Sequence, residues 1–383
     1  MPLTQSDQAT TDVVVVGGGV IGCAIAYYLR RHQIAVTVLE RGNIGEQASG
    51  AAAGLLAPLG PLSGPGPLAD LVLASFARFP ALVAELEEAT GLHLGYEQTG
   101  ALRLVRHPKR VAHLHKRWQH WQPLGLQMVW LTQQEVHQHE PHLAPEVCAA
   151  VYAPQEAQID ARHLTHAFAQ AALTLGARLL PHHNVTELLV EKQRVVGVRT
   201  AQGTTIRCDR LILAAGAWAG TWSARLGLPL PIEPLHGQLL SLPQITPPLR
   251  VILFGEGIYI IPRGPRLVVG ATREARGFDL HADPAGTVWL LETAARLVPS
   301  LATHQVERIW TGLRPKTPDT RPIFGPAPPW ENVSLAVGYN SLGILLSAIT
   351  GQCMAEWMLS GQVDPLFQPF TLQRFLSAPD LGK

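Results

Sequence analysis

The N-terminal region contains a short apolar run that is preceded by a polar residue and followed by glycines. Residues 12–16 read Asp-Val-Val-Val-Val, a pattern typical of a strand buried on both faces of a parallel sheet. After the glycines, apolar side chains recur with the spacing of an amphipathic helix: Ile21, Ile25, Tyr28 and Leu29. A second apolar run at residues 36–39 leads into Glu40. The order strand, helix, strand predicts a parallel βαβ unit.

The rest of the chain alternates between helical and strand periodicity. Helical spacing predicts helices over residues 68–91, 110–121, 160–175 and 288–297, and from 343 onward. Short apolar or alternating runs predict strands at residues 100–105, 176–180, 186–190, 195–200, 204–208, 211–218, 237–242, 257–262, 266–271 and 333–338. These elements predict an α/β fold, in which a doubly wound parallel, Rossmann-like sheet is interlocked with an α+β domain built on a mixed antiparallel sheet.

The length of 383 residues exceeds what one compact core normally holds. We therefore expect a discontinuous nucleotide-binding domain made of residues 1–75, 155–225 and 316–383. Residues 76–154 and 226–315 are expected to form the substrate domain. The chain then crosses between the two domains more than once.

The glycines after the first strand form a dinucleotide-binding fingerprint. Gly17 permits the tight turn, Gly19 lets the backbone approach a pyrophosphate, and Gly22 lets the following helix pack closely on the sheet. Glu40 lies about 20 residues further on, where a carboxylate accepts hydrogen bonds from ribose hydroxyls. An acid there argues against a phosphorylated ribose, although Arg41 follows immediately and weakens that exclusion. The fingerprint alone fits NAD and FAD equally well.

Residues 50–58 are unusually small, reading Gly-Ala-Ala-Ala-Gly-Leu-Leu-Ala-Pro. A globular core normally places bulky side chains in such a segment, so we expect a large flat ring system to lie against this backbone. A second apolar strand closes on Gly216, where a doubly wound sheet meets the nucleotide again.

The charge balance favours a small-molecule partner. Net charge is +1 and 15% of residues are charged, which gives no basic stripe for nucleic acid. The four cysteines are far apart and include no CxxC, so we expect neither disulfides nor zinc, and a cytoplasmic location. The first eleven residues are mostly polar, and we expect no secretory leader. Residues 332–355 carry no charge but contain glycines and polar residues, which favours a loop and a buried helix over a membrane span.

Histidines are frequent, and two stretches raise the question of a metal: residues 113–120 and residues 137–142. Neither stretch has an HExxH pattern or paired cysteines, so we expect no metal site. His236 precedes a predicted strand, where it either lines a pocket or is a hydrogen-bonded turn residue.

Taken together, the motifs resemble the glycine oxidase/D-amino acid oxidase family of flavoproteins over nearly the whole chain. The resemblance is carried by residues 17–22, Glu40, residues 51–55, 259–263, 267–272, 312–315 with 318–319, and 343–346. It implies non-covalent FAD and the oxidation of glycine, a D-amino acid or sarcosine to an imine by hydride transfer from Cα to flavin N5. Dioxygen is then reduced to hydrogen peroxide.

The resemblance also implies a role in thiamine thiazole synthesis, with thiazole synthase as the downstream enzyme, and a homo-oligomer. One alternative is an FAD-dependent D-amino acid or proline dehydrogenase that passes electrons to a quinone or carrier. Another is a flavoprotein that modifies RNA or hydroxylates its substrate.

Site residues follow from the same resemblance. Those implied to hold FAD are Val20 and Ile21 at the pyrophosphate, Glu40 and Arg41 at the ribose, Ala48 and Ser49 at the phosphates, Ala53, Gly54 and Leu55 along the flavin, Val185 at the adenine, and Tyr339, Asn340, Ser341, Leu342, Gly343, Ile344 and Leu345 at the pyrimidine end. Arg314 is implied to hold the substrate carboxylate, and Tyr259 to lie over the same pocket.

Chemistry supports Arg314 independently, because a guanidinium is a natural bidentate partner for a carboxylate. The alternatives to a functional role are that Arg314 is an exposed surface arginine and that Tyr259 is an aromatic residue of the hydrophobic core. Two positions depart from the family pattern, with Ser341 in place of an arginine and Arg273 in place of a methionine. Arg273 either reaches the pocket, where it serves an acidic or longer substrate, or faces solvent together with Glu274 and Arg276, and we expect the second.

Overall fold

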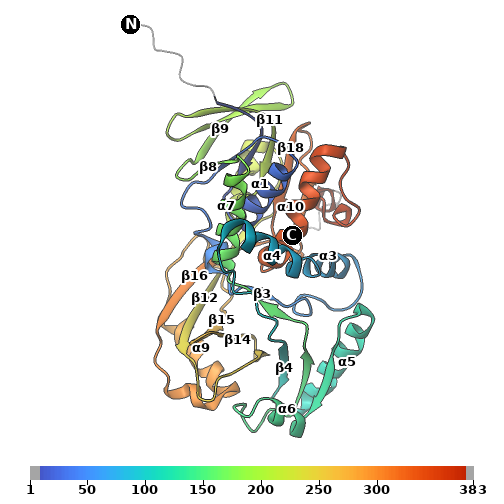
Figure 1. Cartoon of the computed structure of the whole chain (residues 1–383), viewed down its shortest axis with the longest axis vertical. Helices are drawn as coiled ribbons and strands as arrows, with labels where there is room; N and C mark the ends of the chain where they lie inside the picture. The colour runs from blue at the N-terminus through green and yellow to red at the C-terminus, as the bar shows by residue number, and fades with distance from the viewer. Residues whose placement is uncertain (1–8, 377–383) are drawn as a thin grey trace, which may run out of the picture.

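The computed structural model describes residues 9–376 and contains two eight-stranded sheets, one above the other in Figure 1. The predicted fold class is confirmed. Most of the polar N-terminal stretch, on which the expectation about a leader depends, lies outside the described residues.

The first sheet has a parallel centre, in the order β17, β18, β11, β1, β2, β8. Four pairs of neighbouring strands are parallel: β1 with β2, β1 with β11, β11 with β18, and β2 with β8. The edge strand β17 is antiparallel, as is the hairpin of β9 and β10. The strands are β1 (Ala9–Val16), β2 (Val36–Leu39), β8 (Arg178–Leu180), β9 (Val185–Glu191), β10 (Arg194–Thr200), β11 (Thr205–Leu213), β17 (Ile323–Pro326) and β18 (Val333–Val337).

Helices cover this sheet because the central strands are apolar on both faces. The four valines of β1 are all buried. Apolar residues of α1, α7 and α10 form one core with this sheet, and a second core holds the hairpin side. The helices of this part are α1 (Val20–Arg31), α2 (Ala48–Ala51), α3 (Pro67–Phe76), α4 (Phe79–Thr90), α7 (Ala161–Thr174), α8 (Ser223–Leu226), α10 (Gly343–Ser360) and α11 (Gln373–Leu376), with 3-10 turns η2 (Gly216–Trp222) and η4 (Gln368–Phe370).

The second sheet is mostly antiparallel and has the order β16, β12, β15, β14, β13, β4, β6, β5. Its one parallel pair is β13 with β4. The strands are β4 (Ala101–Val105), β5 (Val129–Thr132), β6 (Ala149–Ala153), β12 (Glu233–Pro243), β13 (Ile252–Gly255), β14 (Ile258–Arg263), β15 (Arg266–Gly270) and β16 (Arg308–Lys316). Around it lie α5 (Pro108–Trp121), α6 (Gln133–His139), α9 (Pro284–Leu297), η1 (Gln122–Leu124) and η3 (Pro299–Thr303), and the short pair β3 (Leu55–Leu56) and β7 (Ala157–Gln158) lies apart.

The single helix predicted over residues 68–91 is wrong, because the structure divides it into α3 and α4. Pro80 is the second residue of α4. In a continuous helix, its ring would clash with the carbonyl of Phe76 and leave that carbonyl without its hydrogen bond. The helix therefore restarts, and its first turn accommodates the proline.

The two strands predicted at residues 204–208 and 211–218 are also wrong, because β11 is one strand from Thr205 to Leu213 and residues 216–222 form η2. The two predicted ranges leave out Asp209 and Arg210. The Arg210 side chain donates a hydrogen bond to the Met358 carbonyl of α10 at 2.8 Å. A charged residue with such a partner does not end a strand.

The domain division stays a prediction. One observation bears on its first boundary: Phe79, Leu82 and Leu86 of α4 belong to the same core as the helices of the first sheet. We therefore propose that the nucleotide-binding domain extends to Thr90 rather than ending at residue 75.

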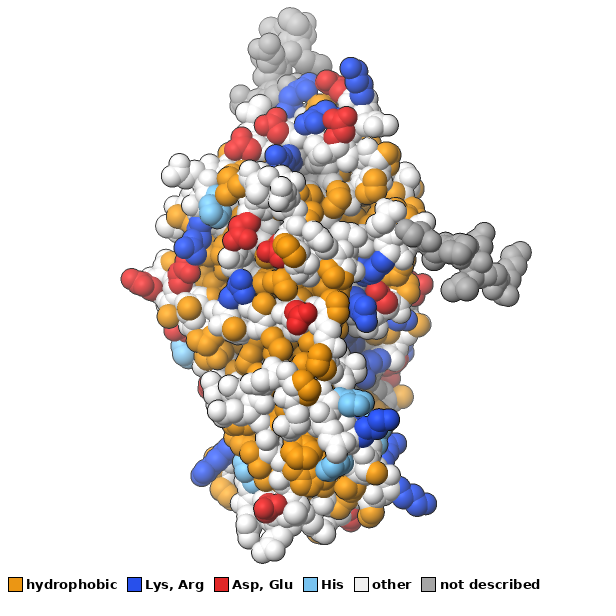
Figure 2. Space-filling model, turned by 90° about the vertical axis from the view of Figure 1, so that its right-hand side faces the viewer, with side chains coloured by type: hydrophobic (Ala, Val, Ile, Leu, Met, Phe, Trp, Pro, Cys, Tyr) orange, Lys and Arg blue, Asp and Glu red, His pale blue; other side chains and the backbone are white. Residues whose placement is uncertain are grey.

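The surface is of mixed charge, and the helices were compared with the requirements for a membrane span. Figure 2 shows one face of the molecule, on which acidic and basic side chains are interspersed with hydrophobic ones. Within residues 9–376, no single helix is both long and apolar enough to cross a membrane, and α3 with α4 meets that requirement only as a bent pair. The four cysteines are free thiols.

Candidate active site

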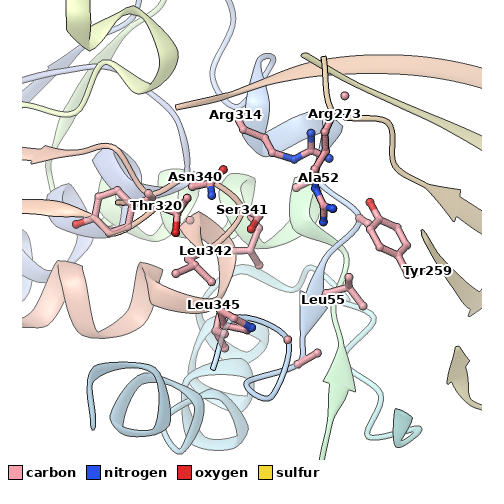
Figure 3. Close-up of a pocket in the computed structure, with 18 of the residues that line it drawn as sticks. Ala52, Leu55, Tyr259, Arg273, Arg314, Thr320, Asn340, Ser341, Leu342 and Leu345 are labelled. Atoms are coloured by element: carbon pink, nitrogen blue, oxygen red, sulfur yellow. The ribbon is translucent and has the colours of Figure 1, made fainter. Parts of the chain in front are cut away.

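A cavity of ≈ 860 Å³ lies where the two sheets meet. Its wall is assembled from segments far apart in the chain: the turn before α1, the small residues 48–55, strands β14 and β16, and the segment leading into α10 (Figure 3). Most of the predicted site residues line it. Those that do not are Gly17, Gly22, Glu40, Arg41 and Val185.

The glycine fingerprint is required by close backbone approaches. Gly17 has φ +113°, and a β-carbon on it would collide with the carbonyl of Ala214 at the end of the neighbouring strand β11. A β-carbon on Gly22 would collide with the carbonyl of Gly17. These two glycines allow the turn without lining the cavity, whereas Gly19 lines it at the start of α1.

The start of α1 and the short helix α2, which carries Ser49, are joined directly. The backbone N–H of Val20 donates to Ser49 Oγ at 2.9 Å. Ser49 and Ala48 both line the cavity, as predicted for residues at the phosphates. Free N–H groups at a helix start, with a hydroxyl beside them, suit a pyrophosphate.

Glu40 is buried beside the fingerprint. Its carboxylate accepts hydrogen bonds from the backbone N–H groups of Gly18 at 2.7 Å and Gly42 at 2.9 Å. These bonds fix the carboxylate and leave further lone pairs for hydroxyl donors. Arg41 does not line the cavity, and its guanidinium lies 3.5 Å from the ring centroid of Trp218. Val185 is buried at the start of β9.

The small-residue segment is held from the second sheet. The Trp310 indole donates to the carbonyl of Ala51 at 3.0 Å, and Arg263 Nη2 donates to the carbonyl of Ala53 at 2.8 Å. A β-carbon on Gly312 would lie 2.6 Å from Cβ of Ala51. Small residues on both sides thus let β16 approach the segment and leave a flat space along Ala53, Gly54 and Leu55.

The start of α10 closes the other side of the cavity. Its N-cap residue, Leu342, supplies no side-chain hydrogen bond, so the first N–H groups of this helix remain available. Asn340, with φ +49°, lines the cavity, and its buried Oδ1 has no hydrogen-bond partner. A ligand with N–H and carbonyl groups fits this wall, because N–H groups can donate to Oδ1 and carbonyls can accept from the helix start.

Arg314 lies flat against the neighbouring strand. Its Nη1 donates to the carbonyl of Thr272 at 3.1 Å and to that of His236 at 3.5 Å. A β-carbon on Gly237 would overlap the guanidinium, lying 2.7 Å from Cζ. Within residues 9–376 no carboxylate forms an ion pair with Arg314. Burial lowers its pKa, but an arginine remains charged at neutral pH.

Tyr259, on β14, lines the same cavity as Arg314, with Arg273 between them in Figure 3. Its ring covers Gly270 of β15. Burial raises the pKa of its phenol, and the charge of Arg314 opposes that shift. The phenol is therefore protonated at neutral pH and can donate a hydrogen bond. The cavity thus presents a cation and a hydroxyl donor to a small anionic ligand.

Two expectations about flanking residues need correction. Arg273 is exposed, but it also lines the cavity, so it does not simply face solvent with Glu274 and Arg276. His236 neither lines the cavity nor forms a turn: it is a fully buried residue of β12, and both its ring nitrogens lack partners. The reason is strand alternation, which points His236 away from the face that Gly237 and Leu235 present.

Sequence reasoning missed the glycines that support the site. Gly237 and Gly312 both lie inside strands, where glycine costs stability and often marks a close approach of another group. That signal was available in the His-Gly-Gln and Thr-Gly-Leu stretches. Thr320 also lines the cavity, and no pattern pointed to it.

The expectation of no metal site stays a prediction. Neither histidine stretch forms a group of possible ligands within the described part of the chain. The one such group there is Cys353, Glu356 and Asp364. Burial raises the pKa of the Cys353 thiol, which keeps it protonated and a poor ligand.

Comparison with known proteins identifies the family. Residues 12–357 match the model of the DAO family, described as FAD dependent oxidoreductase. The chain belongs to this family. Its cofactor is FAD, and the fingerprint, the small-residue segment and the wall at Asn340 fit that group.

Family members resemble the chain along its length. Glycine oxidase from Geobacillus kaustophilus is 35% identical over 368 residues, which cover 95% of this chain and 97% of that protein. A crystal structure of glycine oxidase from that organism has a TM-score of 0.91 and 34% identity, and covers 96% of this chain and 99% of the other. The Synechocystis "Bifunctional protein ThiO/ThiG" is 38% identical over 97% of this chain, which spans only 55% of that relative.

Proposed function

We propose that this family member oxidises glycine and other small amino acids or amines, including D-amino acids and sarcosine, to imines, with dioxygen as the final electron acceptor. The observation that carries the proposal is Arg314, a guanidinium inside the cavity that no carboxylate of the described chain neutralises. A substrate carboxylate is the partner that this geometry lacks. The Geobacillus relative, which matches the chain nearly end to end, is named a glycine oxidase, and no observation favours the dehydrogenase alternative.

The residues of the chain act by binding and orientation. Arg314 holds the substrate carboxylate, and the Tyr259 hydroxyl donates to the same group. Bound FAD supplies the hydride acceptor for the Cα–H bond. No side chain of the described wall is needed as a base at Cα, because the positioned substrate loses its hydrogen as hydride and its amine becomes the imine.

FAD is held by residues that reach it from both ends of the cavity. Gly19, Val20, Ile21, Ala48 and Ser49 bind the pyrophosphate, and Glu40 the ribose. Ala53, Gly54 and Leu55 lie along the flavin, while residues 339–345 contact its pyrimidine end. Gly216 lines the cavity, whereas Arg41 and Val185 contribute from outside it.

The proposal extends to the setting of the reaction. The imine is reactive toward water, so it needs a consumer, which we propose to be thiazole synthase in thiamine biosynthesis. The relative named ThiO/ThiG supports this, because its other portion is physically joined to the part that this chain matches. We further propose a cytoplasmic location, since the free cysteines suit a reducing compartment. A homo-oligomer is proposed on the family resemblance alone.

An Arg314→Gln variant tests the proposal. Loss of a charge-assisted bidentate contact should raise the apparent KM for glycine about 100-fold, while FAD stays bound. Steady-state peroxide production and the flavin content of the purified protein are the two measurements. Arg266→Gln is the matched control, because Arg266 is an exposed arginine that pairs with Glu307 outside the cavity. An unchanged KM in Arg314→Gln would remove this residue from substrate binding and contradict the proposal.

A further inference from the structure

Arg273 is a second cation in the same cavity as Arg314. It lies three residues beyond β15, and its side chain shares the cavity wall with Tyr259 and Arg314 (Figure 3). The charge of Arg273 lowers the pKa of Tyr259, after burial and Arg314 have made their larger contributions, in keeping with this proximity. Two guanidiniums thus face one small-molecule site.

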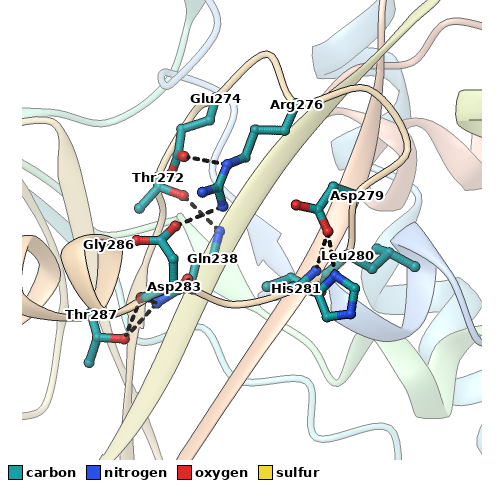
Figure 4. A network of polar contacts seen from close by, with 11 residues as sticks. Gln238, Thr272, Glu274, Arg276, Asp279, Leu280, His281, Asp283, Gly286 and Thr287 are labelled. Carbon is teal, nitrogen blue, oxygen red and sulfur yellow. Dashed lines mark hydrogen bonds and ion pairs between the residues drawn. The ribbon is translucent and has the colours of Figure 1, made fainter.

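The acidic residues that follow Arg273 are engaged elsewhere. Arg276 pairs with Glu274 at 3.1 Å and with Asp283 at 2.7 Å, and Asp279 contacts His281 at 2.6 Å (Figure 4). Within residues 9–376, no carboxylate forms an ion pair with Arg273. The carboxylates of this loop therefore neutralise Arg276, whereas Arg273 has no carboxylate partner in the loop.

The loop of residues 272–283, which contains Arg273, is held at both ends by hydrogen bonds. The Gln238 side chain accepts from the backbone N–H of Asp283 at 2.8 Å and donates to Thr287 Oγ1 at 2.7 Å. Thr272 Oγ1 accepts from the backbone N–H of Gln238 at 2.9 Å. These contacts tie both ends of residues 272–283 to β12 and α9 (Figure 4).

The rest of the cavity wall is also short of negative charge. Among the described lining residues, Glu256 is the one carboxylate. Arg110, Arg117 and Lys316 join Arg273 and Arg314 on the basic side, as do Arg103 and Arg106, which pair with Glu156 and Glu146. A zwitterionic substrate such as glycine brings one carboxylate and one ammonium. It satisfies Arg314 and leaves Arg273 without a partner.

We propose that Arg273 binds a second carboxylate of the substrate, so that the enzyme acts on amines bearing two carboxylates. This inference rests on the proposed amine oxidase function and specifies its substrate class. The second carboxylate has two chemical sources: the side chain of an acidic amino acid, or a carboxymethyl group on the amine nitrogen. In either case one carboxylate binds Arg314 and the other binds Arg273, with the reacting carbon between them.

The test uses the FAD-loaded protein and three forms of the chain: the natural sequence, Arg273→Met and Arg266→Met. Initial rates of peroxide formation are measured with glycine, D-aspartate, D-glutamate and iminodiacetate. We expect kcat/KM of the natural protein to be higher for at least one of the dicarboxylates than for glycine. Arg273→Met should lower that value about tenfold or more through KM, while the value for glycine changes less than about twofold. Arg266→Met should change neither, because Arg266 lies outside the cavity.

Each outcome decides something. A preference for D-aspartate or D-glutamate assigns the second carboxylate to the side chain, and a preference for iminodiacetate assigns it to the nitrogen substituent. Oxidation of glycine but of no dicarboxylate, or equal losses for glycine and dicarboxylate in Arg273→Met, overturns the inference and leaves the proposed function intact. If no amine is oxidised by protein that retains FAD, the proposed function fails and this inference fails with it.

Discussion

At the residue scale, the position of Arg314 depends on a missing side chain. The guanidinium occupies the space that a β-carbon of Gly237 would fill, and it is hydrogen-bonded there to two backbone carbonyls. An arginine held flat in this way presents its remaining N–H groups to the cavity in one orientation. Preorganisation of this kind lowers the cost of binding a carboxylate.

Gly237→Ala should therefore impair substrate binding without touching the substrate. The added methyl group would push the guanidinium out of place, and a shift of about 1 Å should raise the KM for glycine roughly 10- to 100-fold. Steady-state kinetics and flavin content measure the effect. Ser241→Ala, on the same strand but outside the cavity, is the control. An unchanged KM for Gly237→Ala would show that Arg314 does not need this space.

The residue scale also shows what the sequence could and could not predict. Arg314 and Tyr259 were accessible because their spacing follows a family pattern. A glycine inside a strand at position 237 was a visible signal, but its contact with Arg314 was not predictable, because that contact depends on the pairing of β12 with β16, which places Leu235 opposite Arg314. The prediction for Arg273 was incomplete. The side chain is exposed, as expected, but it also lines the cavity, and Arg276 takes both Glu274 and Asp283.

At the element scale, α1 connects the cofactor site to the core. Nearly every residue of this helix is buried, including Cys23, whose thiol contacts the Gly18 carbonyl at 3.5 Å. Burial, and then the charge of Glu40, raises the pKa of this thiol from 9.0 to about 12. The folded protein therefore holds this proton at a pH where the unfolded chain has lost it.

Stability should consequently fall as the pH rises above about 9. The folded pKa of Cys23 is raised, so its contribution is present below the unfolded value of 9.0 and is lost progressively toward about 12. By pH 11 the loss should reach roughly 2–3 kcal/mol of the free energy of unfolding. Denaturant unfolding at pH 8 and pH 11 measures it, and Cys23→Ala should lose correspondingly less between these two values. Equal losses in both proteins would contradict this origin.

Elements with strong periodicity were predicted well, and their exceptions have local causes. The βαβ unit, α7, β8 and the start of α10 follow the apolar pattern of the chain. Pro80 divided one expected helix, and Arg210 bridged two expected strands through its bond to Met358. The edge strand β16 was not predicted, because it mixes exposed, charged and glycine positions.

At the scale of the whole molecule, the site depends on contacts from the second sheet to the small-residue segment 50–58. Trp310 and Arg263 of the second sheet reach Ala51 and Ala53 across more than 200 positions of sequence. Such contacts carry no local signal, so the sequence could indicate a flat ring at residues 50–58 but not what encloses it. In the proposed function, the small residues of this segment lie along FAD, while Arg314 and Arg273, which line the same cavity, bind the substrate.

An anaerobic titration of the purified, FAD-containing protein with glycine, sarcosine, D-alanine and D-proline is the first measurement to make. We expect the flavin absorbance band to bleach with at least one of them, and air to restore the band and yield hydrogen peroxide. Bleaching without reoxidation by air would contradict the oxidase assignment. A band unchanged by any amine, in protein that retains its FAD, would contradict amine oxidation by this protein.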